Sequence, residues 1–230
     1  MLALWQLQGL LVSNGKFNPD AETVEMLLEV IATEESWVKS SALWFLGMSQ
    51  DSTYAELYHD LLHDWSDRVT NAAAIALGKT RSAGAYEALV ALQDKPSWKN
   101  QSLISALNGL QWLGDERGVE LALQSLRSNE AKHWTLATPI WDHRLAAGIA
   151  LNVLGETETA YDFIARQLEA AIEEEDLNDV LYNTLQIVNL ADPRGREAFE
   201  KLKGMYSEDA TVLEAIENYE RQFLTKLKQK

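Results

Sequence analysis

The sequence lacks cysteine entirely, which excludes disulfides, thiolate metal sites and cysteine nucleophiles. Glycine and proline are scarce, at twelve and four of 230 residues, so the chain is poor in the turn residues that sheets of short strands require. Apolar residues nevertheless make up 47% of the chain, enough to bury a large core. This composition predicts an all-α protein.

Basic residues are also in deficit, since 20 Lys and Arg stand against 35 Asp and Glu, which gives a formal net charge of -15. Acids exceed bases in both halves of the sequence. Proteins that bind nucleic acid neutralise phosphates with clustered Lys and Arg, so no nucleic-acid partner is predicted. A basic or neutral partner surface is expected instead.

The sequence contains no apolar run that approaches the roughly 18 residues of a membrane span. Its apolar start lacks the basic region and cleavage site of a signal peptide, and nothing decides between a cytoplasmic and an exported bacterial protein. Amphipathic periodicity begins at Leu2 with no capping residue before it. We therefore expect this chain to be the C-terminal part of a longer protein.

One sequence pattern recurs along the chain: it predicts an Ala- and Leu-rich helix, a short polar turn and a second amphipathic helix. In the clearest copy, residues 67–95, apolar side chains recur at helical spacing on both sides of the turn 78–82. Equivalent turn positions are 31 to 41 residues apart, a spacing typical of helical-pair solenoids. The residues expected to cap the second helices at these turns are Asp51, Ser82, Asp115 and Asp192.

The turns 114–118 (Gly-Asp-Glu-Arg-Gly) and 191–195 (Ala-Asp-Pro-Arg-Gly) resemble the Gly-Asp-Pro-Arg-Ala turn of HEAT-like repeats, especially those of the phycobilin-lyase-type subclass. The resemblance spans about residues 36–206 and implies an all-α fold, a right-handed α-α superhelix of the HEAT-like solenoid type. We expect a single domain, 1–230, with the second helices of its pairs lining a concave surface. About six antiparallel helix pairs and a C-terminal capping helix are expected, at approximately 1–34, 36–65, 67–95, 98–128, 141–171, 176–206 and, for the cap, 208–229.

The irregular repeat lengths and the uncapped start are similar to the helical-repeat extension that follows the catalytic domain in some bacterial zinc aminopeptidases of the aminopeptidase N-like family. This resemblance implies a covering or docking role beside a catalytic domain that is absent from this chain. Peptide hydrolysis in that family needs an H-E-x-x-H motif, which this sequence lacks. No enzymatic activity and no catalytic residue are therefore predicted for the chain itself.

Two groups of residues have some potential to bind metal. His59 and His63 have the i, i+4 spacing of paired ligands, but Asp60 stands in place of the catalytic Glu and no third ligand is evident. The acidic run 173–176, with Asp179 beyond it, lacks the alternating ligands and the glycine of a calcium loop. Solvent-facing histidines and a solvated helix end are the simpler interpretations, so no metal or cofactor is predicted.

The longest irregular stretch, residues 129–139, makes one repeat longer than a scaffold requires. Such loops often carry recognition, and Trp and Arg are enriched at binding hot spots. The predicted partner-binding residues are His133, Trp134, Trp141 and Arg144. Alternatively, the two tryptophans plug a gap between imperfectly stacked repeats. Filling of such interfaces is also expected for most other tryptophans, including Trp37, Trp44, Trp65, Trp98 and Trp112.

The sequence thus predicts a non-catalytic interaction or accessory domain whose partner is a protein or peptide surface, or a catalytic domain of the same polypeptide. One alternative is a free-standing HEAT-repeat scaffold. Another is a chaperone or lyase for a bilin-type chromophore, which needs an apolar pocket with convergent polar groups on the concave face. A DNA-repair glycosylase of HEAT-like fold uses a basic groove and is disfavoured by the charge of -15.

Overall fold

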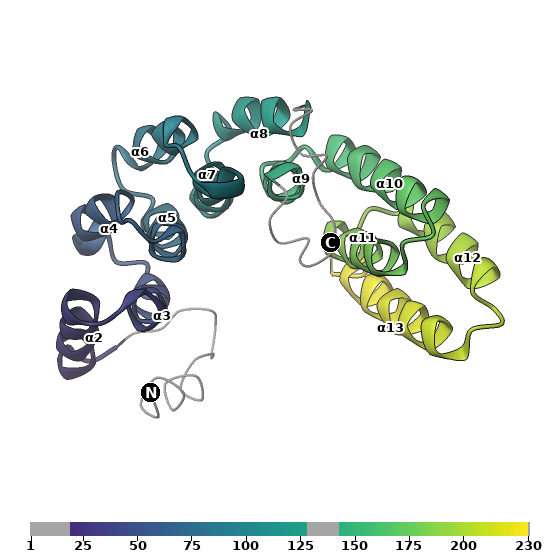
Figure 1. The fold of residues 1–230 in the computed structure, drawn as a ribbon, viewed down its shortest axis with the longest axis horizontal. Coiled ribbons are helices and arrows are strands. Elements are labelled where there is room, and N and C mark those ends of the chain that lie inside the picture. The colour runs from purple at the N-terminus through teal and green to yellow at the C-terminus, as the bar shows by residue number, and fades with distance from the viewer. Residues whose placement is uncertain (1–18, 128–142, 230) are drawn as a thin grey trace. The chain divides into compact units, whose positions relative to one another are not determined.

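The structure is a computed structural model that describes residues 19–127 and 143–229 (Figure 1). Within these ranges every regular element is a helix, which confirms the predicted all-α helical-repeat solenoid. None of the helices described is long and apolar enough to cross a membrane. The expected first helix of the pair 1–34 falls on residues 1–18, outside the described residues.

The chain forms two compact units, residues 1–121 and 122–230. Unit 1 contains α2 (Ala21–Thr33), α3 (Ser36–Gly47), α4 (Ala55–Leu61), α5 (Asp67–Thr80), α6 (Ala85–Ala91) and α7 (Gln101–Leu113). It also contains the short 3-10 turns η1 (Ser52–Tyr54), η2 (Leu92–Asp94) and η3 (Trp98–Asn100). Unit 2 contains α9 (His143–Val153), α10 (Thr157–Glu173), α11 (Leu177–Leu190), α12 (Gly195–Met205) and α13 (Ala210–Leu227), and α8 (Gly118–Arg127) spans the boundary.

Aspartate side chains cap several of the helices. Asp51 accepts a hydrogen bond from the Thr53 backbone N–H at 2.9 Å, as expected for the start of η1. The expected cap at Ser82 is wrong, because α6 begins after Gly84, whose φ of 81° belongs to the left-handed region that glycine adopts at little cost. The Ser82 hydroxyl instead accepts a hydrogen bond from Thr80 at 3.0 Å.

The two turns with the Asp-x-Arg sequence share one set of contacts, which we call the Asp–Arg turn. In the first, the Asp115 carboxylate accepts hydrogen bonds from the backbone N–H and the guanidinium of Arg117. The same guanidinium donates to Glu87 at 3.0 Å and lies 3.9 Å from the centroid of the Tyr86 ring. Because Tyr86 and Glu87 belong to α6, the turn before α8 is fastened to the preceding second helix.

The second Asp–Arg turn repeats this geometry inside unit 2. Asp192 accepts from the backbone N–H and the guanidinium of Arg194. Arg194 in turn donates to Asp162 at 2.8 Å and lies 4.4 Å from the centroid of the Tyr161 ring, both on α10. The predicted turn signature therefore has a physical role: it links the turn of one helix pair to the second helix of the pair before it.

Unit 1 arranges its helices in two rows (Figure 1). We call α3, α5 and α7, which pack side by side, the first-helix row, and α2, α4 and α6 the second-helix row. The first-helix row lies on the inner side of the curve of unit 1, so the expectation that second helices line the concave surface is wrong there. The reason is close packing, since a Cβ at Gly47 would lie 2.7 Å from the Ala76 Cβ and one at Gly78 only 2.1 Å from the Gly109 carbonyl oxygen.

Unit 2 packs α10 against α9 and α11, and α13 against α11 and α12. Phe199 of α12 and Phe223 of α13 are fully buried, with ring centroids 5.2 Å apart. Ile187 of α11 and Ile216 of α13 are buried with them. The apolar stripes of α11, α12 and α13 thus meet in one core at the C-terminal end of the chain.

Candidate protein-docking surface

The predicted partner-binding residues are only partly visible. His133, Trp134 and Trp141 lie outside the described residues, while Arg144 lies in the first turn of α9. The Arg144 guanidinium carbon is 6.0 Å from the centroid of the Phe163 ring of α10, so this side chain packs within unit 2. The recognition role of these four residues stays a prediction.

The two groups with metal-ligand potential each have a structural explanation. His59 of α4 and His63 in the turn after it are exposed, and their rings meet edge to face with centroids 6.1 Å apart. No group of three or more His, Cys, Asp or Glu that could hold a metal ion occurs in the part of the chain that the structure describes. In the acidic run 173–176, Asp176 caps α11 by accepting from the backbone N–H groups of Asn178 and Asp179.

The tryptophans depart most clearly from expectation. The predicted filling of repeat interfaces is wrong for the five that the structure describes, all of which are exposed: Trp37, Trp44, Trp65, Trp98 and Trp112. Interfaces within the first-helix row are occupied by glycine and alanine, so there is no room for an indole between these helices. Large aromatic surface is left facing solvent instead.

Two of these tryptophans flank a buried lysine, in a group that we call the Trp–Lys cluster: Trp44, Met48, Lys79 and Trp112. The Lys79 Nζ lies 4.4 Å from the ring centroid of Trp112 and 5.6 Å from that of Trp44. It also lies 3.0 Å from the Met48 Sδ. Lys79 is only 6% exposed, whereas Trp44 and Trp112 are 40% and 45% exposed.

The position of each member follows from the helix row. Lys79 and Trp112 are the second-last residues of α5 and α7, and Trp44 lies in the last turn of α3. Gly78 contacts Gly109 and Leu113 so closely that the C-terminal ends of α5 and α7 adjoin. The three first helices therefore bring together residues that are about one repeat apart in the sequence.

Among the described residues, the ammonium of Lys79 is unusual for a buried charge because no carboxylate pairs with it. No Asp or Glu forms an ion pair with it among the residues that the structure describes. Buried charges in proteins are normally paired, because their removal from water is costly. Burial accordingly lowers the pKa of Lys79, and the faces of two indoles offer partial compensation through cation–π attraction.

Charge is segregated between the two rows of unit 1. The second-helix row carries six acidic residues and no Lys or Arg. The first-helix row carries one acid, Asp67, and three bases, Lys39, Arg68 and Lys79, of which Lys39 lies 3.8 Å from Asp64. Six acids without a Lys or Arg thus lie on the helices of the outer row, while the helices of the inner row have two more bases than acids.

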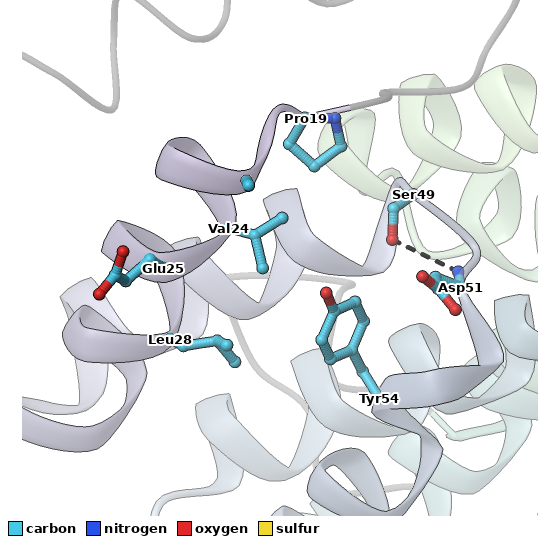
Figure 2. Close-up of a pocket in the computed structure, with 8 residues that line it drawn as sticks. Pro19, Val24, Glu25, Leu28, Ser49, Asp51 and Tyr54 are labelled. Carbon is cyan, nitrogen blue, oxygen red and sulfur yellow. Dashed lines mark hydrogen bonds between the residues drawn. The ribbon is translucent and has the colours of Figure 1, made fainter.

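A hollow of about 460 Å³ opens elsewhere in unit 1, between α2 and the segment that joins α3 to α4 (Figure 2). Its lining residues are Pro19, Ala21, Val24, Glu25, Leu28, Ser49, Asp51 and Tyr54. The Ser49 hydroxyl accepts from the Asp51 backbone N–H at 3.3 Å, and the bond from Thr53 lowers the pKa of the Asp51 carboxyl (Figure 2). The polar groups of the hollow thus serve the local turn, and it does not open on the first-helix row.

Comparison with known families agrees with this architecture. Residues 24–108 match the family model for HEAT repeats, a range that runs from α2 into α7. The match supports a HEAT-like repeat protein. No curated protein matches the chain. Stacked helical repeats of this kind present extended surfaces to protein partners, so the comparison favours a protein-interaction scaffold.

Proposed function

We propose that this chain is a non-catalytic protein-interaction domain that docks a protein or peptide segment on the first-helix row of unit 1. The observation that carries the proposal is the Trp–Lys cluster, which presents two half-exposed indoles around a buried ammonium. Exposed apolar patches framed by polar residues mark interaction sites, and Trp is the residue type most enriched at binding hot spots.

The face extends beyond the cluster along α3. Trp37 is 51% exposed and lies seven residues before Trp44, which places both indoles on the same side of the helix. On α5 and α7, Asn71 and Asn108 join the helices by a side-chain hydrogen bond of 2.9 Å. The row therefore offers aromatic, polar and cationic groups on one rigid support, as docking of an extended segment requires.

A finer form of the proposal concerns the partner. The chain acts as an accessory domain that covers or docks beside an N-terminal zinc aminopeptidase-like catalytic domain of the same polypeptide. The irregular repeat lengths support this form. A free-standing scaffold, or a binding protein of the phycobilin-lyase type, is the alternative, and His133, Trp134, Trp141 and Arg144 would supply a second contact in either form.

Peptide selection tests where the docking surface lies. Peptides are selected from a random displayed library on the wild-type chain, and their affinities are compared by fluorescence polarisation for the double variant Trp44→Ala/Trp112→Ala. We expect affinity to fall by roughly thirtyfold, the equivalent of about 2 kcal/mol at a hot spot. The matched control is Trp65→Ala/Trp98→Ala, which removes two exposed indoles outside the row and should leave affinity within about twofold.

The proposal predicts opposite results for the two double variants. If the selected peptides bind Trp44→Ala/Trp112→Ala as tightly as the wild type but bind the control variant more weakly, the docking surface does not lie on the first-helix row. A library that yields no binder would contradict peptide docking on this row altogether. Circular dichroism of each variant checks that the helices remain folded.

A further inference from the structure

We infer that the Trp–Lys cluster is a recognition site for a carboxylate, and that the segment docked on the first-helix row is acidic, with an Asp or Glu side chain reaching Lys79 between Trp44 and Trp112. This inference rests on the proposed docking function and adds the chemistry of the partner. Its basis is the juxtaposition of a buried ammonium, two half-exposed indoles and a row whose charge is opposite to that of the chain.

The Lys79 ammonium lacks a counter-ion among the described residues. The Lys79 ammonium lies 3.0 Å from a thioether sulfur and over two ring faces, and no described carboxylate pairs with it. Neither a ring face nor a sulfur satisfies an ammonium as a carboxylate does, because charge-assisted hydrogen bonds are about twice as strong as neutral ones. A partner that supplies a carboxylate completes this site.

The position of Lys79 in the fold also favours a bound carboxylate. Lys79 lies near the C-terminal end of α5, where the helix dipole already favours a cation and so helps to retain the charge. The surrounding indoles exclude water, which strengthens the attraction between the ammonium and an incoming anion. They also leave apolar surface exposed beside the ammonium, so a carboxylate flanked by apolar residues fits better than a free inorganic anion.

The charges of the two helix rows are also complementary to an acidic segment on the inner row. The inner row has two more bases than acids, while the outer row of the same unit has six acids and no Lys or Arg. Within unit 1, the charges of the two rows therefore favour an acidic segment on the inner row over the outer one. This proposal differs from the expectation of a basic or neutral partner surface that the net charge alone suggests.

Two matched peptide libraries test the inference. Both consist of capped hexapeptides with randomised apolar flanks, and they differ only in a fixed central Glu or Gln. Binding to the full chain is measured by fluorescence polarisation at low and moderate salt. We expect the Glu library to bind at least tenfold tighter than the Gln library, with a preference that shrinks as salt rises.

Substitutions of Lys79 assign the preference to the cluster. Lys79→Met keeps the length and apolar stem of the side chain and should abolish the preference for Glu, while Lys79→Arg keeps the charge and should retain it. If Lys79 has only a structural role, Lys79→Met should keep the preference for Glu over Gln peptides. Thermal unfolding shows whether each variant is folded, and we expect Lys79→Met to be no less stable than the wild type because it removes a desolvated charge.

The outcomes separate the two proposals. Equal binding of both libraries, lost in Trp44→Ala/Trp112→Ala, would overturn the carboxylate inference and leave the docking function standing. Preference for Glu that survives Lys79→Met would place the anion elsewhere, and no binding of either library would overturn the inference. Sedimentation measurements test a further outcome. If the wild type self-associates and Lys79→Met does not, the acidic occupant is a second copy of the chain.

Discussion

Two glycines, one in each unit, face their neighbouring helices at different distances. In unit 1, a Cβ on Gly78 of α5 would lie 2.1 Å from the carbonyl oxygen of Gly109 on α7, closer than any real side chain comes. In unit 2, a Cβ on Gly148 of α9 would meet its nearest neighbour, a side-chain carbon of Ile164 on α10, at 3.7 Å, an ordinary van der Waals contact. Glycine is therefore a packing requirement at the first site and is replaceable at the second.

This difference explains why the candidate surface lies in unit 1. Helices that meet backbone to backbone leave no interface for large side chains, so Trp44 and Trp112 project to the solvent side. Close approach also aligns the ends of α5 and α7, which brings Lys79 against Trp112. The packing that makes the row rigid thus also creates its exposed aromatic face.

The largest expected effect comes from adding one methyl group at each glycine. Gly78→Ala forces α5 and α7 apart and should destabilise the protein by about 3 kcal/mol, the upper part of the usual range for overpacking. Gly148→Ala should be neutral, or stabilise by up to about 1 kcal/mol, because alanine is the better helix former and space is available. Urea unfolding followed by circular dichroism measures both variants.

Segment-resolved hydrogen exchange sharpens this comparison. In Gly78→Ala the loss of protection should be concentrated in α5 and α7 and should spare α10 to α13. Equal costs for the two substitutions would show that the close approach of α5 and α7 does not govern the stability of unit 1.

A second, smaller contrast concerns buried tyrosines. Tyr58 of α4 is fully buried, and its hydroxyl has no hydrogen-bond partner among the described residues. Tyr161 of α10 is also buried, but its hydroxyl is not among the buried groups that lack a partner. Tyr58→Phe should therefore stabilise the protein by about 1 kcal/mol, because it removes an unsatisfied polar group. Tyr161→Phe is the matched control and should not stabilise it.

The pH dependence of this effect has a definite sign. Burial raises the pKa of Tyr58, so the folded state holds the phenol proton to higher pH than the unfolded state. As pH rises above about 10, the ordinary tyrosine value, the unfolded state ionises first and the wild type loses stability. Tyr58→Phe should lose less stability than the wild type between pH 8 and pH 11, and parallel losses in both proteins would contradict the assignment.

The repeat architecture was accessible from the sequence because its signals are local. Apolar spacing, turn composition and the Asp-x-Arg pattern all lie within a few residues of one another, and the turns 114–118 and 191–195 do make equivalent contacts. The cap at Ser82 failed for a local reason as well, because Gly84 starts α6 with a left-handed residue instead.

The Trp–Lys cluster was not accessible in this way. Its members come from three helix pairs, and each one alone is an ordinary residue near a helix end. The difference in charge between the two helix rows was missed for a related reason. The N-terminal half of the chain contains the helices of both rows, so a count of acids and bases by halves combines them. Comparing the solvent-side positions of successive first helices would have found both features, because Lys79 and Trp112 occupy matching places in consecutive repeats.

The smallest expected effect concerns the two Asp–Arg turns, where the units are most alike. Asp192 is the less exposed aspartate, with 11% of its side chain accessible against 25% for Asp115. Removal of the arginine side chain takes its guanidinium hydrogen bonds from a more buried carboxylate in unit 2, so Arg194→Ala should lower the thermal midpoint more than Arg117→Ala. Arg196→Ala, at an exposed position that makes no ion pair among the described residues, is the control and should change it least.

Acid titration separates the contribution of the turn from a general loss of charge. Hydrogen bonds from Arg117 hold the pKa of Asp115 below its ordinary value, so the turn stabilises the folded state above that value and the gain is lost as pH falls through the folded pKa. Arg117→Ala should therefore be less stable than the wild type at pH 7 and converge with it in acid, while the Asp115 carboxyl resonance titrates at higher pH. If all three arginine variants behave alike at pH 7, the Asp-x-Arg pattern shapes the turn without joining the repeats, and close helix packing alone must hold the stack together.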